Sequence, residues 1–176
     1  MFFKKTKAQR EKEKSIRKAV KKVSKRKPRA RDEKKVLRQI FNEYIRIRDC
    51  LDTTGSTDYC KCCTCGQIKP NSGAMVHAGH FVKSTHNACT FDPENVHGQC
   101  KKCNSFEGGR EAEYSEYIID KYGLKKFKAL LAQKKCSKRF SRHELIDLQN
   151  EYSEKLNSLI KNEPYTRKSP KPTKLD

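Results

Sequence analysis

Four of the nine cysteines lie within residues 60–65, in the segment CKCCTC, and two more lie at the ends of the segment CKKC, residues 100–103. Both segments contain cysteines separated by two residues, a spacing that lets two thiolates face one metal ion. Two such pairs can complete a tetrahedral zinc site. We therefore expect the chain to fold around a structural Zn²⁺ ion that joins two segments separated by 34 residues.

The first segment offers two overlapping pairs, Cys60–Cys63 and Cys62–Cys65. Gly66 follows the second pair and suits the tight backbone turn under a metal knuckle, whereas the stiffer Thr64 follows the first. We favour the second pair on this steric ground, with Cys60 and Cys63 as the alternative. The predicted zinc ligands are Cys62, Cys65, Cys100 and Cys103. The remaining cysteines are isolated in sequence and are predicted to act as small apolar residues: Cys50, Cys89 and Cys136.

Composition supports a metal rather than disulfides. An odd number of cysteines cannot pair completely within one chain, and the opening MFFKKTKAQREKEK lacks the apolar stretch of a secretory signal. We therefore expect a cytoplasmic protein. Only 34% of the residues are apolar and 35% are charged, so the core must be small. A bound ion would supply folding energy that apolar burial cannot.

The positive charge is concentrated at the N-terminus. The formal net charge is +20, and residues 1–38 contain 18 Lys and Arg against 4 Asp and Glu. Such a surplus indicates a polyanionic partner, most simply nucleic acid, and no apolar run approaches the roughly 20 residues that span a bilayer. We interpret residues 1–32 as a disordered arm that binds DNA phosphates; a solubilising tail is the alternative. Its candidate contacts are Lys21, Lys22, Lys25, Arg26, Lys27, Arg29 and Arg31.

Helical periodicity flanks the cysteine-rich segment. Apolar residues recur at helical spacing over residues 33–49, while residues 50–110 are irregular and rich in Cys, His and Gly. Residues 111–162 are expected to form a helical C-terminal region, in which Gly123 separates short helices at 111–122 and 124–133. Its last helix starts at a capping box, Ser141 with Glu144. The apolar stripe of that helix is expected to serve as core or as a subunit contact. Residues 163–176 are expected to form a flexible tail. The predicted fold class is α+β.

The segment between the two knuckles predicts a strand, a loop, a second strand and a short helix, from MVHAGHFV, TFDPENVHGQC and CNSFEGGR. This order resembles the HNH nucleases, also called His-Me finger or ββα-metal nucleases. The patterns CxxCG, AGHF, FDPENVHGQC and CNxxxGG resemble the NinG (Rap) recombination endonuclease family of lambda-like phages. The resemblance runs from about residue 36 to residue 160 and is specific over 62–110. It implies a small zinc-clamped ββα-metal core flanked by N- and C-terminal helices.

The resemblance also assigns candidate site residues. His80 takes the position of the general base, and an imidazole with a pKa near neutrality suits that role. Asn95 takes the central position of the motif and is expected to fix the loop by hydrogen bonds rather than take part in the chemistry. Asn104 takes the last position. A catalytic Mg²⁺ or Mn²⁺ would be held by Asn104 with His77 or His97. Two further residues are candidate DNA phosphate contacts: Lys83 and Arg110.

Two positions depart from the related families. Gly79 stands where many HNH sites have an Asp or His that helps to hold the metal. His77 is the replacement we expect, but alternation along a strand puts His77 and His80 on opposite faces unless the strand kinks at Gly79. The second departure is the sequence GGR at residues 108–110.

The function that the resemblance implies is metal-dependent cutting of branched recombination intermediates, including Holliday junctions and D-loops. The alternative is a non-catalytic, zinc-containing DNA-binding protein that assists recombination. The expected partners are branched DNA and phage or host recombination proteins in the bacterial cytoplasm. Symmetric junction cutting would favour a homodimer, and the 141–162 helix is a candidate contact.

Overall fold

The structure is a computed structural model that describes residues 11, 14, 30–85 and 87–161. The predicted C-terminal tail and most of the predicted basic arm lie outside the described residues. Of the seven arm residues expected to contact DNA, only Arg31 is described, and its side chain is exposed. Within the described residues, no helix combines the length and apolarity needed to cross a bilayer.

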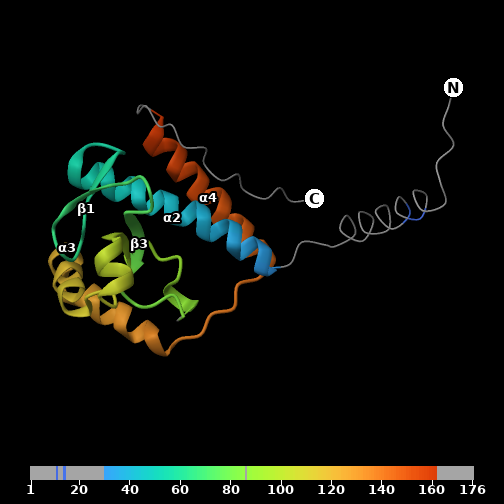
Figure 1. Ribbon diagram of the computed structural model, residues 1–176. Coiled ribbons are helices and arrows are strands. Elements are labelled where there is room, and N and C mark those ends of the chain that lie inside the picture. Colours follow the sequence, from blue (N-terminus) through green and yellow to red (C-terminus); the bar gives the residue numbers. More distant parts are fainter. Residues whose placement is uncertain (1–10, 12–13, 15–29, 86, 162–176) are drawn as a thin grey trace, which may run out of the picture.

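Helix α2 spans Ala30–Thr54 and is longer at both ends than the predicted 33–49 helix. Its first turn contains Asp32 and Glu33, whose negative charges stabilise the positive, N-terminal end of the helix dipole. Its apolar residues recur three or four positions apart and are fully buried on one face. The helix therefore forms the central support of the molecule (Figure 1).

Helix α4, Arg142–Ile160, lies alongside α2 (Figure 1). The predicted capping box is present, since the Ser141 side chain accepts from the Glu144 backbone N–H and the Glu144 side chain accepts from the Ser141 N–H. Tyr152 packs its ring 4.8 Å from that of Phe41 on α2 and donates a hydrogen bond to the Phe91 carbonyl. The apolar stripe of α4 is therefore core, used within this chain.

Two antiparallel hairpins carry the knuckles. Strands β1 (Tyr59–Lys61) and β2 (Ile68–Pro70) form a short ribbon. Strands β3 (Val76–His80) and β4 (Val96–Cys100) form the central hairpin, in which every residue of β3 pairs with one of β4. A single π-helical turn, η2 (Lys102–Phe106), follows β4 directly. The strand, strand and short helix therefore occur in the predicted order.

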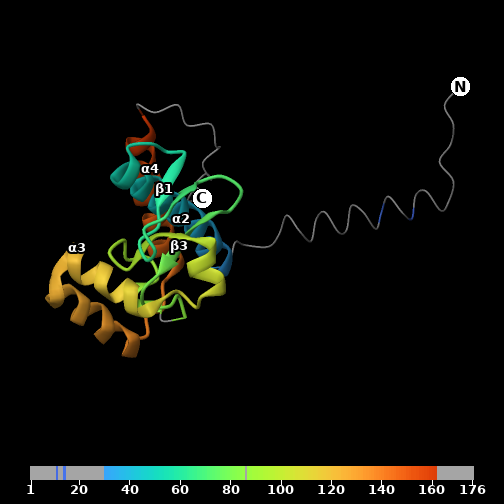
Figure 2. The same ribbon diagram turned by 60° about the vertical axis from the view of Figure 1, so that its left-hand side comes forward.

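Helix α3, Glu111–Ala132, follows η2 and is kinked at Gly123, which has φ 81° and ψ 163°. The kink separates the two helices expected on either side of this glycine, and the two halves run in different directions (Figure 2). Tyr114 and Ile118 of α3 pack against Phe81, just after β3. The short turns η1 (Asn87–Cys89) and η3 (Gln133–Lys135) complete the described chain.

The central hairpin lies between α2 on one side and α3 on the other. Val96 of β4 belongs to the cluster of α2 and α4, whereas the His97 ring lies against Tyr114 and Tyr117 of α3. Helices and two small antiparallel sheets thus surround a cluster of four cysteines that could hold zinc. The predicted α+β class is confirmed.

Candidate active site and metal centre

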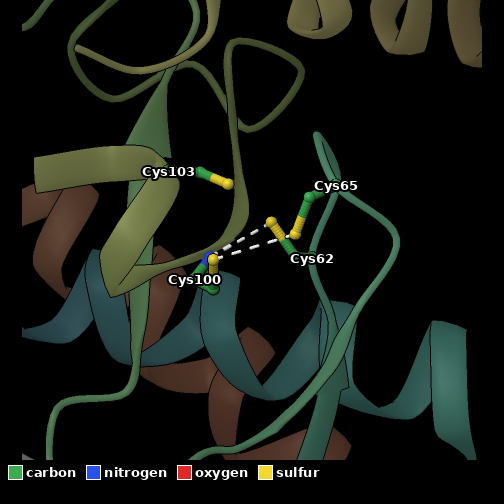
Figure 3. Close-up of side chains that lie close together, drawn as sticks. All are labelled: Cys62, Cys65, Cys100 and Cys103. Atoms are coloured by element: carbon green, nitrogen blue, oxygen red, sulfur yellow. Dashed lines mark hydrogen bonds between the residues drawn. The ribbon is translucent and has the colours of Figure 1, made fainter. Parts of the chain in front are cut away.

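The four predicted zinc ligands lie together. The sulfur atoms of Cys62, Cys65, Cys100 and Cys103 are all within 4.8 Å of one another. Cys62 and Cys65 come from the turn between β1 and β2, and the other two flank the junction of β4 and η2 (Figure 3). The Sγ atoms of Cys65 and Cys100 are 3.9 Å apart, close to the roughly 3.8 Å expected for thiolates on one tetrahedral zinc. This donor set fits a structural Zn²⁺ ion.

Local backbone geometry explains why this pair is the one used. Gly66 adopts φ +70°, and its N–H donates to the Cys62 carbonyl at 3.0 Å, which closes the knuckle. A left-handed φ favours glycine, as the sequence argument requires. Burial opposes ionisation of the Cys62 thiol, but hydrogen bonds from the Cys100 N–H and the Thr64 hydroxyl lower its pKa to about 6. Cys62 is therefore prepared to bind metal as a thiolate.

The other cysteines lie outside this cluster. Cys60 is buried against Cys50 and Val76, so Cys50 packs as a small apolar residue, as expected. Cys63 packs beside the α3 core instead of facing the other thiols. Cys89 is buried as expected, but Cys136 is exposed at the surface after η3, which corrects its interpretation as an apolar core residue.

His80 ends β3 and is half-buried. Its Nε2 lies 3.0 Å from the carbonyl oxygen of Thr90. A carbonyl only accepts, so Nε2 carries the proton and the neutral ring has its lone pair on Nδ1. Burial lowers the pKa of His80, and the positive charge of Arg38 lowers it further. The Thr90 and Ala78 backbones oppose this shift, but its net direction is downward, so His80 is a neutral imidazole around pH 7 with Nδ1 as the nitrogen that can accept a proton.

His80 borders a pocket of about 230 Å³. Two lysines also line this pocket, Lys83 shortly after β3 and Lys134 in η3. Lys134 forms an ion pair with Glu111 at 2.9 Å, at the first turn of α3. The sequence analysis missed Lys134 because no local motif distinguishes it from neighbouring lysines. Only the path of α3 brings it beside His80.

His77 and Asn104 lie in direct contact. The Nδ2 atom of Asn104 is 2.9 Å from Nδ1 of His77, and Ser105 Oγ is 3.4 Å from the same nitrogen. The β3–β4 register is regular from end to end, so β3 does not have the kink at Gly79 that would bring His77 and His80 to one face. A continuous ladder leaves no place for a bulge, and alternation then directs His77 and His80 to opposite faces of the strand.

Gly79 is required by close packing across the hairpin. A Cβ atom at this position would lie 2.4 Å from Oε1 and 2.9 Å from Cβ of Gln99, and 3.2 Å from Oδ1 of Asn104. The space that a side chain at residue 79 would occupy is thus filled by Gln99 and Asn104. Glycine therefore allows Asn104 to reach the strand next to His80.

The structure does not bring His97 to the pocket. Its side chain has no exposed surface and lies beneath the α3 tyrosines. The Nδ1 atom contacts Arg48 Nη2 at 3.0 Å and Asp49 Oδ2 at 3.3 Å, and burial lowers its pKa. These contacts hold His97 in the core, so the expectation that it could bind a catalytic metal or take part in the chemistry is corrected. His77 is the candidate that remains.

The ion pair that holds His97 was also missed by the sequence analysis. Asp49 is 2% exposed and accepts from the Gly98 N–H at 2.6 Å and from Arg48 Nε at 2.7 Å. Arg48 donates in addition to the carbonyls of Pro93 and Val96. The sequence did contain one indication of this pair: Asp49 lies four positions after Ile45 and so falls on the apolar face of α2. This pair attaches α2 to β4.

Asn95 is fully buried and joins three segments of the loop between β3 and β4. Its Oδ1 accepts from the Val82 N–H at 2.7 Å, and its Nδ2 donates to the carbonyls of Val82 and Cys89 at 3.0 Å. The bond to Cys89 fixes the backbone at that residue and so also the position of the next residue, Thr90, whose carbonyl orients His80. The geometry suits a residue that fixes the loop.

The two further DNA contacts predicted from the sequence differ in their surroundings. Lys83 is exposed at the pocket. Arg110 has a left-handed φ of 50° before α3, and its guanidinium pairs with Glu113 and lies 3.7 Å from Glu107. Arg110 is therefore engaged within the chain, while Lys83 is placed to meet a phosphate.

The family of the chain is given by a sequence comparison. The family model for the bacteriophage lambda NinG protein matches residues 2–163, which is most of the chain. Neither a curated protein nor a solved structure matches it. The match covers both knuckles, the central hairpin and all the helices described above. The chain therefore belongs to the bacteriophage lambda NinG family, which has a role in phage recombination.

Proposed function

We propose that this protein is a metal-dependent endonuclease that cuts branched DNA, such as Holliday junctions and D-loops, in the cytoplasm of the infected host. The observation that carries the proposal is the state of His80. It is a neutral imidazole whose Nε2–H is held by the Thr90 carbonyl, at the edge of a pocket lined also by Lys83 and by the ion pair of Lys134 with Glu111. A base of this kind beside an exposed lysine suits hydrolysis of a phosphodiester.

In the proposed reaction, Nδ1 of His80 takes a proton from a water molecule as its oxygen attacks phosphorus. The bond from phosphorus to the 3′ oxygen breaks, leaving a 5′ phosphate and a 3′ hydroxyl once the leaving oxygen gains a proton. Lys83 and Lys134 attract the DNA backbone into the pocket, because phosphate contacts position a nucleic acid without reading its sequence. The Thr90 carbonyl keeps the ring of His80 in the required tautomer.

The side chains that would hold a catalytic Mg²⁺ or Mn²⁺ are Asn104 and His77. Neither lines the pocket that His80 borders, so the proposed reaction requires the scissile phosphate to lie across the end of β3 and reach both groups. They offer one amide oxygen and one imidazole, a small set that suits a hard cation whose other ligands are phosphate and water. Such a cation would relieve the charge that develops on the phosphate and on the leaving oxygen. Asn104 follows the zinc ligand Cys103 directly, so the structural zinc would fix its position against β3.

A second candidate is a DNA-binding recombination protein without catalysis. The direct hydrogen bond between Nδ2 of Asn104 and Nδ1 of His77 favours this candidate, because each side chain then has a partner within the chain and not a metal ion. Among the described residues, the four cysteines are also the one group of three or more Cys, His, Asp or Glu side chains close enough to hold a metal ion. This candidate keeps the zinc and the basic charge but needs no base at residue 80.

The test compares cleavage of a labelled four-way junction, a D-loop and a matched linear duplex, with Mg²⁺ or Mn²⁺. The His80→Ala variant should lose about 10²- to 10⁴-fold in rate, the range of general-base catalysis, with zinc content and DNA affinity unchanged. His143→Ala is the matched control, because His143 is an exposed histidine on α4. Absence of cutting by the unaltered protein, with junction binding intact, would establish the second candidate instead.

A further inference from the structure

Phe106 is the most exposed large apolar side chain in the described part of the chain, with 75% of its surface accessible. It ends η2, two residues after Asn104 and three after the zinc ligand Cys103. Neither large hydrophobic cluster includes it among the described residues. An aromatic ring left in water gives up the stabilisation that burial would bring, so its position calls for a partner outside the chain.

The ring is presented by a rigid element. The turn that carries it begins at β4 and is anchored at both ends of the second knuckle, by Cys100 and Cys103. The Glu107 N–H donates to the Lys102 carbonyl at 3.0 Å, and the Gly109 N–H donates to the Cys103 carbonyl at 2.9 Å. Phe106 is thus fixed close to Asn104 and does not sit on a loose loop.

Two lysines and one glutamate lie near Phe106. The Lys101 ammonium lies 5.9 Å from the centre of the Phe106 ring, and the Lys102 side chain is 75% exposed with its ammonium 3.3 Å from the Glu107 carboxylate. The Lys101 N–H donates to the carbonyl of Met75, a second exposed apolar residue. An aromatic ring beside lysines is the combination that binds single-stranded nucleic acid, because bases stack on the ring and phosphates pair with the charges.

We propose that Phe106 stacks on an unpaired base at the branch point of the DNA, while Lys101 and Lys102 bind the adjoining phosphates. The inference rests on the proposed function and deepens it, since it names the feature of the substrate that is recognised. A fully paired linear duplex offers no free base face along its length, whereas a D-loop does in its displaced strand and a junction does where a base pair at the branch point opens. Phe106 would therefore set the preference for branched DNA and bring the strand beside Asn104.

A single fluorophore can test this contact, because the chain contains no tryptophan. In the Phe106→Trp variant, without added Mg²⁺ or Mn²⁺, tryptophan emission should be quenched by a branched DNA with unpaired bases and much less by the paired duplex. Leu124→Trp is the matched control, an exposed apolar position on α3, and should respond equally little to both. Equal emission from Phe106→Trp with both DNAs at saturation would overturn the proposal.

Affinity gives the second measurement. Phe106→Ala should weaken binding to the branched DNA by about tenfold, as expected for loss of one stacked base, and leave duplex affinity unchanged. Leu124→Ala should change neither. If Phe106→Trp is quenched but the unaltered protein does not cut DNA, the stacking contact is retained and the endonuclease is rejected. If the protein cuts DNA and Phe106→Ala keeps the same preference for branched DNA, the endonuclease is retained and the stacking contact is rejected.

Discussion

The four-cysteine cluster and the His80 pocket differ in how completely the chain builds them. The cluster has four like donors within 4.8 Å, three of them buried, and needs only the ion. The pocket has one half-buried imidazole, two lysines and Glu111, and the chemistry proposed for it needs DNA and a cation. A structural site can be closed by short local motifs, whereas a site of action must stay open to its substrate.

The two regions are joined by one short stretch of backbone. Cys103 faces the cluster, and the next residue, Asn104, contacts His77 on β3. The four-cysteine cluster therefore fixes Asn104 against β3 and does not itself line the His80 pocket. The predictions below separate these roles, beginning with the change that should have the greatest effect.

Loss of one zinc ligand should have the largest effect. Cys62→Ser should release the metal and unfold the central hairpin, because structural zinc contributes about 10–16 kcal/mol in small zinc domains. Zinc per chain and the unfolding temperature measure this. Cys60→Ser, which changes a buried cysteine outside the cluster, should keep one zinc. The assignment of ligands fails if Cys60→Ser loses zinc and Cys62→Ser retains it.

Breaking the buried ion pair between α2 and β4 should come next. Asp49→Ala leaves Arg48 without its partner and should cost about 3–5 kcal/mol of unfolding free energy. Asp52→Ala on the same helix removes an exposed carboxylate 3.6 Å from Lys121 and should cost less than about 1 kcal/mol. Denaturant unfolding compares the two variants, and equal losses would contradict the role given to Asp49.

The same carboxylate predicts a dependence of stability on pH. Burial opposes ionisation of Asp49, but hydrogen bonds with His97 and Arg48 outweigh it and hold the pKa well below its ordinary value. A depressed pKa in the folded state stabilises the fold above the unfolded value near 3.9, and this contribution disappears as the pH falls further. As the pH is lowered, the unfolding free energy of Asp49→Ala should therefore fall less steeply than that of the unaltered protein.

A side chain at Gly79 should destabilise the fold less than the changes above, but it should displace Asn104 and so reduce the rate of cleavage. Gly79→Ala should cost about 1–3 kcal/mol, as overpacking does, and should slow cleavage because Asn104 must move. The double variant with Gln99→Ala removes the nearest obstacle and should recover part of the stability. Zinc content should stay the same in both variants, since neither residue is a ligand. No recovery in the double variant would argue against the packing explanation.

The smallest change concerns only the proton affinity of His80. As the pH falls below the lowered pKa of His80, kcat/KM for cleavage should fall about tenfold per pH unit, with the acid limb below about 6.5. Arg38→Ala removes a positive charge that lowers this pKa, so the limb should move to higher pH. Lys35→Ala, another exposed basic residue of α2, should leave it in place. A limb that does not move with Arg38→Ala would mean that another group titrates.

Local signals predicted those parts of the fold that depend on neighbours in the chain. The capping box at Ser141, the kink at Gly123 and the strand that carries His80 follow from residues a few positions apart. The exact extent of α2 did not follow, because its last turn is held by contacts with β1: the Thr53 hydroxyl accepts from the Lys61 N–H and the Thr54 hydroxyl donates to the Tyr59 carbonyl. The sequence left open whether β3 kinks at Gly79, and pairing with β4 along the whole strand decides that it does not.

The sequence alone determined the zinc ligands and the family, because the spacing of two cysteines and one glycine acts over a single turn of backbone. Only the tertiary structure decided which histidines are open. His97 and His80 look alike in sequence, yet α3 and the Arg48–Asp49 pair enclose the first while the second borders a pocket. Burial depends on elements that are distant in the chain, so no local pattern could separate the two.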